Sequence, residues 1–340
     1  MLSREASDVM KELELEIHTH MDHSNSLSEA ISMETIFSVR SRVTSVLKCV
    51  PRCMLTTLHK SYICFLLQHG QYESVSTEFD YPISIIQESV LDSDIMLFFY
   101  YLGLSQIKTG RFAAARSSML AVLAIPSTCY SVISLAALRK LCLLDLIEKS
   151  KLDPLPDWID RRNSVLSRVW EEMRKSSSRQ VSQDESIPDT YDETNLSFTL
   201  YTALVRAFTS SDDPRHLCSI IDSHQEYLLA AKDLGLASKV LLAKYSQLLT
   251  QVSLLYSSIE ISGMLRKMHL QTVNGLEEII SFSNAKSDLF ARIEGDYLVF
   301  EPHVTLRSAP VIPHIVENIR SLRTYTHTEL QNVLRSRLSI

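Results

Sequence analysis

The stretch Val240–Glu301 constrains the fold most, because its hydrophobic period changes from that of a helix to that of a β-strand. It begins with Val240–Tyr256, in which apolar residues recur at the three- and four-residue spacing of one helical face. We expect a long amphipathic helix here, with one side buried. The apolar positions of that side are Leu241, Tyr245, Leu248, Leu249, Val252, Leu255 and Tyr256.

Shorter elements follow this helix. The segment Ile259–Ile261 is expected to be extended, and Ser262 and Thr272 are suited to cap two further helices. Two segments that alternate between apolar and polar residues then predict a β-hairpin with a glycine turn. Helix, short strand, helix, helix and hairpin is the order of elements in a winged helix. The hairpin segments are Leu289–Ile293 and Tyr297–Phe300, joined at Glu294-Gly295-Asp296.

Glycine is scarce, at 7 of 340 residues. Average proteins contain about 7% glycine, so this chain is strongly depleted. Phosphate-binding loops, doubly wound sheets and β-rich folds use glycine in turns with positive φ. We therefore expect an all-α fold of helices joined by short polar turns, to which the winged helix adds one small β-hairpin.

Two predicted helices earlier in the chain end in the same way. Leu55–Leu67 is followed by Gly70-Gln71-Tyr72, and Asp94–Lys108 is followed by Gly110-Arg111-Phe112. A helix with a glycine–aromatic turn that recurs in this way predicts a right-handed, tetratricopeptide-like solenoid of helical hairpins. Solenoids present extended surfaces, so this architecture favours binding over catalysis.

The second copy also has residues suited to close packing. Gly103 and Ala115 are small enough for paired helices to approach closely, and Phe112 is expected to fill the groove between them. The following stretch, Ser117–Leu138, carries no charge and is long enough to span a membrane. Because Pro126 interrupts it, we expect two buried helices instead.

The N-terminal two thirds of the chain divide into two parts. Residues 1–54 are expected to form N-terminal helices with a polar end, and Met1–Ser28 is expected to fray although it contains apolar residues at helical spacing. Residues 55–238 form the helical-repeat region. Within it, residues 175–195 are rich in Ser, Asp and Glu without an apolar period, which predicts a disordered insertion.

The remaining residues form two further parts. Residues 239–303 hold the winged helix, and residues 304–340 hold a linker and a C-terminal helix. This last helix has one apolar stripe that must dock either on its own chain or on a partner. The stripe consists of Ile315, Ile319, Leu322, Leu330 and Val333.

Charge and cysteine content limit the class of function. The formal net charge is -6, which argues against a general binder of nucleic acid or of anionic membranes. The cysteines lie mostly in apolar helical stretches, so we expect reduced, buried thiols in a protein of the cytosol or nucleus. They are Cys49, Cys53, Cys64, Cys129, Cys142 and Cys218.

Several of these motifs resemble one family. The winged-helix region resembles the PCI module, which is shared by scaffold subunits of the proteasome lid, the COP-9 signalosome and translation initiation factor three. The repeat region is most similar to the subunit 3 family of the COP-9 signalosome, and the resemblance covers Leu55–Leu338 apart from the insertion. The matching segments are Leu97–Gly103, Lys108–Phe112, Leu123–Pro126, Leu138–Leu144, Tyr245–Leu249, Tyr256–Ser262, Leu289–Gly295 and Val299-Phe300.

The resemblance implies a non-catalytic scaffold subunit of the signalosome, which removes a ubiquitin-like modifier from cullins and so regulates cullin-RING ubiquitin ligases. It implies other signalosome subunits as partners, with subunits one and eight as neighbours, in the cytoplasm and nucleus, and no substrate, cofactor, nucleic acid or membrane. We expect docking through the C-terminal helix and through an open edge of the hairpin. The predicted interface residues are Tyr297, Leu298, Val299, Phe300, Ile315, Ile319, Leu322, Leu330 and Val333.

Other functions remain open. PCI subunits of the proteasome lid or of translation initiation factor three share this layout. A PCI adaptor in messenger-RNA handling would need basic residues on the hairpin, where Arg292 stands alone. DNA reading is disfavoured, because the predicted reading helix His269–Ala285 contains Glu277 and Glu278 but neither Lys nor Arg.

A more remote alternative is a metal-dependent hydrolase. His18, His20, Asp22 and His23 have the H-x-H-x-D-H spacing with which metallo-β-lactamase-type hydrolases bind two zinc ions. That site also needs a preceding strand, a glycine-rich loop and distant ligands on a β-rich scaffold. Because this chain lacks that context, we expect a solvated polar segment and no metal site.

We predict that the purified chain holds no stoichiometric zinc and has no hydrolase activity, because the motif around His20 lacks the scaffold of a zinc site. Metal analysis of the purified protein checks this. One or two tightly bound zinc ions per chain that are lost in His20→Ala would contradict it.

Overall fold

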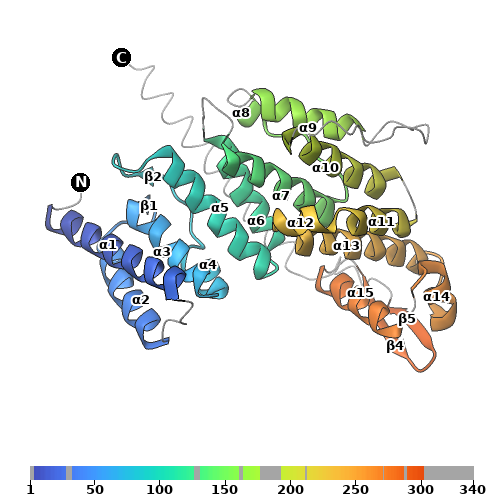
Figure 1. Cartoon of the computed structure of the whole chain (residues 1–340). Helices are drawn as coiled ribbons and strands as arrows, with labels where there is room; N and C mark the ends of the chain where they lie inside the picture. Colours follow the sequence, from blue (N-terminus) through green and yellow to red (C-terminus); the bar gives the residue numbers. More distant parts are fainter. Residues whose placement is uncertain are drawn as a thin grey trace, which may run out of the picture.

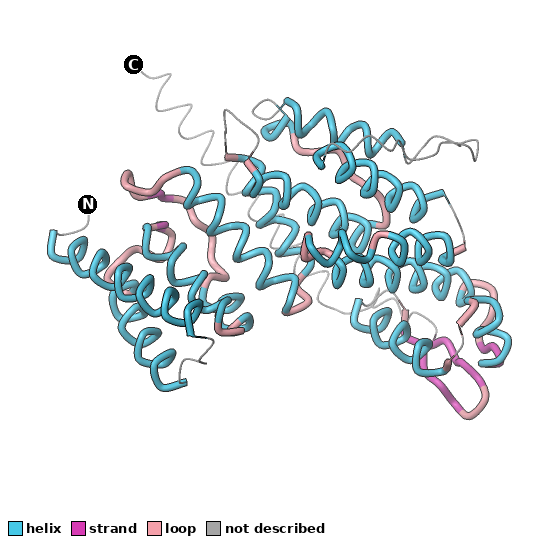
Figure 2. Tube along the Cα trace, in the orientation of Figure 1, coloured by secondary structure: helices cyan, strands magenta, loops and turns pink. Residues whose placement is uncertain are grey.

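The computed structural model of the chain describes residues 4–27, 33–125, 131–160, 164–176, 193–210, 213–270, 272–286 and 289–301. Its helices follow one another along an elongated body, from α1 (Arg4–Leu27) at one end to β4 (Phe290–Glu294) and β5 (Tyr297–Glu301) at the other (Figure 1). Helix dominates the trace, with short strands in two places (Figure 2). The expected mostly helical fold is confirmed.

The first helices share one hydrophobic core. On α1, Met10, Leu13 and Ile17 are almost completely buried and pack against the helices that follow. The expectation that Met1–Ser28 is a frayed polar end is therefore wrong for the described residues, because one face of α1 is core. The other elements of this part are α2 (Met33–Leu47), α3 (Thr57–Gln68), α4 (Tyr72–Glu78) and α5 (Asp92–Lys108).

A short pair of parallel strands precedes α3. β1 (Met54–Leu55) pairs with β2 (Ile85–Ile86) in the loop between α4 and α5. The predicted helix from Leu55 thus begins two residues later than expected. The physical reason is Thr56, which has an extended backbone and occupies the N-cap of α3.

Both glycine–aromatic turns have the same structure, which confirms the helical repeats. Gly70 and Gly110 have φ of 71° and 77°, the left-handed conformation that side chains disfavour. The next amide donates back into each preceding helix, from Gln71 to the Leu66 carbonyl at 2.9 Å and from Arg111 to the Gln106 carbonyl at 2.8 Å. The aromatic residue then begins α4 or α6 (Phe112–Ala124).

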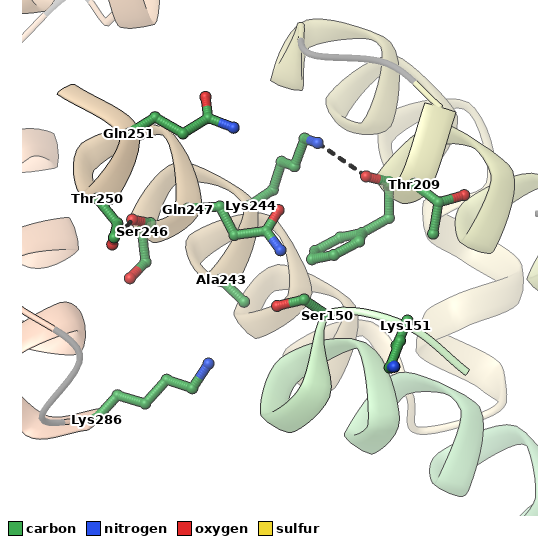
Figure 3. A pocket seen from close by; sticks show the side chains of 11 residues that line it. Ser150, Lys151, Thr209, Ala243, Lys244, Ser246, Gln247, Thr250, Gln251 and Lys286 are labelled. Atoms are coloured by element: carbon green, nitrogen blue, oxygen red, sulfur yellow. Dashed lines mark hydrogen bonds between the residues drawn. The ribbon is translucent and has the colours of Figure 1, made fainter. Parts of the chain in front are cut away.

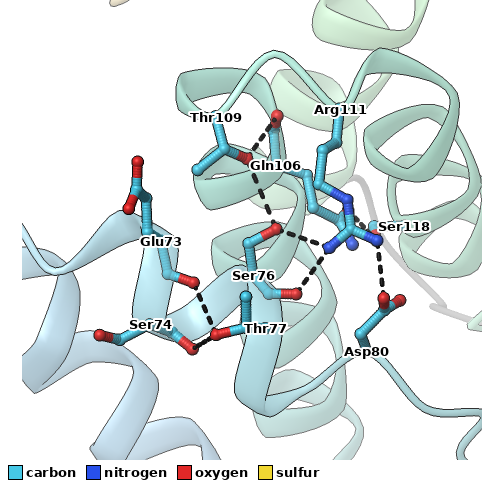
Figure 4. Close-up of polar contacts among 9 residues, drawn as sticks. All are labelled: Glu73, Ser74, Ser76, Thr77, Asp80, Gln106, Thr109, Arg111 and Ser118. Atoms are coloured by element: carbon cyan, nitrogen blue, oxygen red, sulfur yellow. Dashed lines mark hydrogen bonds and ion pairs between the residues drawn. The ribbon is translucent and has the colours of Figure 1, made fainter.

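Arg111 joins the second turn to the repeat before it (Figure 4). Its Nη1 donates to the Ser76 carbonyl at 2.7 Å and to the Ser76 hydroxyl at 2.9 Å, and its Nη2 pairs with Asp80 at 2.7 Å. The Ser76 carbonyl lies in the last turn of α4, where no intrahelical amide is available. The turn of one repeat thus caps a helix of the previous repeat.

Gly103 lets α5 and α6 approach closely, as expected. A Cβ atom there would lie 3.3 Å from the Ser118 Cβ and 2.6 Å from the Met119 Cε. Ala115 is fully buried in the same contact. Phe112 differs from expectation, because it is only half-buried and lies beneath the Lys239 ammonium at 5.3 Å from the ring centroid.

The central core surrounds α7, and its main polar feature is Asp233, which is fully buried. Asp233 forms an ion pair with Lys140 of α7 and accepts a hydrogen bond from the hydroxyl of Tyr201 on α10. Burial and the nearby carboxylate raise the pKa of Tyr201. The elements here are α7 (Val132–Lys149), α8 (Asp157–Asp160), α9 (Ser164–Ser176), α10 (Glu193–Ser210), α11 (Pro214–Ser223) and α12 (Gln225–Ala230).

Helix α13 (Leu234–Ser253) belongs to two cores. Leu236 and Val240 pack in the central core, whereas Leu249 and Val252 pack against the last elements of the chain. The predicted boundary at 238/239 therefore falls inside one continuous helix. The last elements are β3 (Ser258–Glu260), α14 (Ile261–Met268), α15 (Val273–Lys286), β4 and β5.

The structure confirms one of the two predicted helix caps. The Thr272 hydroxyl accepts from the Gly275 amide at 3.4 Å, as a cap should, but α14 begins at Ile261 with Glu260 as its N-cap, so Ser262 is not the cap. Helices α9 and α10 take up both ends of the predicted insertion 175–195. Its residues 177–192 and the C-terminal residues 302–340 lie outside the described residues.

Two further expectations concern burial and membranes. Among the described cysteines, only Cys142 is buried, so the expectation of buried thiols is wrong for the others, although all five are free. The uncharged stretch around Pro126 does contain two helices, α6 and α7. In the described ranges, every helix lacks the combination of length and apolar character that a membrane crossing requires.

His59 is a buried base in the N-terminal core. Its side chain packs between Phe79 and Phe98, with ring centroids 5.8 and 6.0 Å away, and the Thr56 amide donates to its Nδ1 at 3.1 Å. Burial lowers the pKa of His59 from 6.5 to about 4. The unfolded chain therefore takes up this proton at a higher pH than the folded chain does.

We predict that Gly103→Leu lowers the free energy of unfolding by about 1–3 kcal/mol, because the new side chain meets Ser118 and Met119 in a packed interface. The matched control is Gly263→Ala in α14, where the new Cβ would meet nothing within 4 Å beyond its chain neighbours and the backbone of its own helix. This control should gain about 0.5–1 kcal/mol. Urea denaturation measures both, and an unchanged Gly103→Leu midpoint would show that the α5–α6 contact is wrong.

We predict that the chain loses stability as the pH falls from 6.5 to about 4, because only the unfolded state protonates His59 in that range. This group should contribute about 3 kcal/mol to the loss, at about 1.4 kcal/mol per pH unit. His59→Gln keeps an acceptor for the Thr56 amide and does not titrate. Thermal melts across this range should show a shallower pH dependence for the variant, and equal slopes would contradict the assignment.

Candidate interaction surface

The three strands at the C-terminal end form one antiparallel sheet in the order β3-β5-β4. On β5, Leu298 pairs with Ile259 of β3 on one side and with Ile293 of β4 on the other. The expectation that Tyr297–Phe300 is an open edge is therefore wrong. A third strand, β3, takes the place that a neighbour's strand was expected to take.

The residues of β5 point to opposite faces of the sheet, as the period of a strand requires. Leu298 and Phe300 are buried in the core beneath the sheet, with exposed fractions of 0% and 6%. Tyr297 is 55% exposed, and Val299 is half-buried on the same outer face. Of the four predicted interface residues on this strand, only these two can meet a partner without unfolding.

The outer edge of β4 is capped at Ala291 by a side chain. Asn284 of α15 donates through its amide nitrogen to the Ala291 carbonyl and accepts through its oxygen from the Ala291 amide, both at 3.0 Å. These two backbone groups are the ones that an added strand would use. Asn284 thus blocks strand addition at Ala291.

The outer edge of β3 is different. The Phe300 amide donates to the Ser257 carbonyl and the Ile261 amide donates to the Asp296 carbonyl, each at 2.9 Å. Because paired residues in antiparallel strands alternate, the backbone groups of Ser258 and Glu260 point away from β5. No strand in the described part of the chain pairs with them.

Exposed apolar residues lie next to this edge. Leu254, Leu255 and Tyr256 join α13 to β3 and have exposed fractions of 81%, 73% and 49%. Leu255 and Tyr256 were expected on the buried side of the helix. That expectation is wrong because α13 ends at Ser253, so the helical period no longer applies to them. We call the edge of β3 at Ser258 and Glu260, together with these three residues, the β3 surface.

One feature of the sequence indicates that the helix ends before the β3 surface. Two serines, Ser257 and Ser258, follow the apolar run directly, which marks the end of the helix earlier than periodicity alone suggests. The order of strands had no such signal, because an alternating segment does not reveal on which side a third strand will pair.

The charged side chains around the sheet disfavour binding of nucleic acid, as the sequence predicts. Glu277 and Glu278 are exposed on α15. On the hairpin, Arg292 pairs with Glu294 at 2.7 Å, so its charge is offset locally. A phosphate backbone would meet more negative than positive charge on this side of α15.

The histidine motif lies within helix α1, whereas the zinc site that it resembles follows a strand. His18 points toward α3, where its Nε2 lies 3.4 Å from the Ser61 hydroxyl. The side chains of His20, Asp22 and His23 lie outside the described residues. Across the residues that the structure does describe, no group of three or more His, Cys, Asp or Glu could hold a metal ion.

The remaining predicted interface residues belong to the C-terminal helix and lie outside the described residues. They are Ile315, Ile319, Leu322, Leu330 and Val333. Their contribution to an interface stays a prediction.

Comparison with known proteins bears on the repeats. Residues 8–161 match a family model described as COP9 signalosome complex subunit 3, N-terminal helical repeats. This confirms the resemblance to the subunit 3 family over helices α1 to α8. The match begins in α1, well before Leu55, and so includes the N-terminal helices that the sequence motifs had left out. A search of curated proteins returned no match.

Proposed function

We propose that this chain is a non-catalytic scaffold subunit of a COP-9 signalosome, the complex that removes a ubiquitin-like modifier from cullins. The observation that carries the proposal is the family match over residues 8–161. It is supported by a helical-repeat body, which offers extended surfaces rather than an enclosed catalytic site. We place the function in the cytoplasm and nucleus, where the complex would meet cullin-RING ligases.

We further propose that α13 to β5 form a PCI winged-helix module, with residues 239–303 as its extent. The support is the order of elements, which is helix, strand, helix, helix and two strands. Residues 1–54 and 55–238 would then form the repeat body, and residues 304–340 would carry the C-terminal bundle helix.

The β3 surface is the docking site that we propose for a neighbouring subunit. The amide and carbonyl of Ser258 and the amide of Glu260 can pair with a strand from another sheet, which would satisfy their hydrogen bonds. The Glu260 carbonyl lies at the N-cap of α14 and accepts the first hydrogen bond of that helix instead. Leu254 and Leu255 would be covered at the same time, and burial of exposed apolar area is the main source of affinity. The other edge, at Ala291, is blocked by Asn284.

A second contact is proposed for the C-terminal helix. Its apolar stripe, from Ile315 to Val333, would enter a helical bundle with other subunits. Signalosome subunits one and eight are the proposed neighbours, on the strength of the resemblance. The two contacts are separable, because deletion of Pro313–Ile340 leaves every residue of the β3 surface in place.

We predict that Ser258→Pro weakens the incorporation of the chain into its complex while the chain itself stays folded. The Ser258 amide points away from β5, so proline removes an outward donor and keeps the internal ladder. Leu254→Asp with Leu255→Asp should have the same effect by charging the apolar part. Affinity purification with identification of the partners measures incorporation, and circular dichroism checks folding.

The matched control is Leu229→Asp on α12, which is 64% exposed but distant in sequence from the β3 surface. It should leave partner recovery unchanged. Full recovery of partners with all the β3-surface variants would contradict docking at β3. Recovery of proteasome-lid or initiation-factor subunits in place of signalosome subunits would contradict the assignment of the complex.

A further inference from the structure

A cavity of about 680 Å³ lies where the repeats meet the last helices. Figure 3 shows side chains from the end of α7, from α10, from α13 and from α15 around it. Three of its lining residues are lysines, namely Lys151, Lys244 and Lys286, and none is Asp or Glu. This is a concentration of positive charge in a chain whose formal net charge is -6.

Lys244 forms part of the cavity wall. It is only 6% exposed, and its Nζ donates to the Phe208 carbonyl at 2.8 Å and lies 5.4 Å from the centroid of the Phe208 ring. A nearly buried ammonium is weakly screened by solvent, so its field extends into the cavity. An anion there would gain from a charge that is already fixed in place.

Lys286 and Lys151 line the cavity from two different parts of the chain, the end of α15 and the segment after α7. Lys286 is the last residue of α15, and in Figure 3 its side chain extends toward the end of α7, near Ser150. Lys151 follows Ser150, the C-cap of α7, and is exposed. One ligand placed between these two lysines would therefore connect α15 to the repeat body.

The uncharged lining suits the same kind of ligand. Hydroxyl and amide groups from Ser150, Gln247 and Gln251 line the same cavity. Such groups donate hydrogen bonds to phosphate oxygens, and an ammonium group is a common phosphate partner. The volume lies within the range of small-molecule sites, about 300–1,000 Å³.

A second cavity continues the basic character. It has a volume of about 570 Å³, shares Lys286 with the first, and adds Arg111 and Lys239, against one carboxylate, Glu148. The two cavities together are lined by five cations and one carboxylate at the junction of the repeats with α13 and α15. Because the Arg111 guanidinium already pairs with Asp80, the four lysines are the cations that face a ligand here.

We propose that this junction binds a compact ligand with several phosphate groups, held between Lys151 and Lys286 above Lys244. The ligand links α15 to the end of α7 and so stiffens the connection between the repeat body and the last helices. This inference does not rest on the proposed docking function, and it adds a small-molecule site to a chain that the resemblance treats as a scaffold only.

A purely structural role for these lysines makes a different prediction. Lys286 lies in the last turn of α15, where a cation also offsets the helix dipole. If that were its only role, its loss would lower stability but would leave no ligand-dependent difference between variants. The test must therefore measure ligand binding and not stability alone.

The test is calorimetric titration of the full-length chain with sodium tripolyphosphate at constant ionic strength, with orthophosphate alongside. We expect saturable binding of tripolyphosphate at one site and much weaker binding of orthophosphate. Lys151→Gln with Lys286→Gln should weaken binding by at least about tenfold, because charge-assisted hydrogen bonds are lost. Lys286→Arg, which keeps the charge, should retain binding.

The matched control removes the same number of charges elsewhere. Lys11→Gln with Lys267→Gln alters two exposed lysines outside both cavities and should leave the affinity unchanged. An equal loss in this control would show non-specific attraction and overturn the site. No saturable binding of tripolyphosphate, or tighter binding of a doubly phosphorylated peptide than of tripolyphosphate, would overturn the assignment to a compact polyphosphate.

Discussion

The arrangement of the central helices depends on one buried carboxylate. Asp233 stands directly before α13 and is paired with Lys140, which is also buried, while Arg139 lies 3.9 Å away. Charges inside a protein are costly unless they are paired and hydrogen-bonded. Helices α7, α10 and α13 must therefore pack in one relative arrangement, because any other packing leaves Asp233 or Lys140 without its partner.

The fixed packing of these central helices also positions the elements at both ends of the molecule. The far half of α13 carries the core beneath the three-stranded sheet, and α5 shares Phe99 between the central and N-terminal cores. Each shared helix is continuous, so the sheet cannot turn relative to the repeats without a break in α13 or in its packing. The cavity with Lys244 lies along this same helix, at the place where its two halves join different cores.

Features set by neighbouring residues could be read from the sequence, and features set by distant residues could not. The turns at Gly70 and Gly110 were predictable because each depends on one left-handed residue and one aromatic residue nearby. The hairpin around Gly295 was predictable for the same reason. By contrast, Lys140 and Asp233 are 93 residues apart, and no local pattern shows that they pair. The central place of β5 depends in the same way on Ser258–Glu260, which pairs with it from an earlier part of the chain.

The side chain of Asn284 has a consequence for how chains can be joined. An antiparallel sheet with two available edges can be extended in both directions, which allows filaments to grow by repeated strand addition. Here one direction ends at Ala291, where an amide side chain imitates the missing strand. Strand addition at Ala291 would have to displace Asn284, whereas the edge of β3 at Ser258 carries no such cap among the described residues. Repeated strand addition needs both edges of the sheet, so the capped residue on β4 works against open-ended polymerisation through this element within a single monomer.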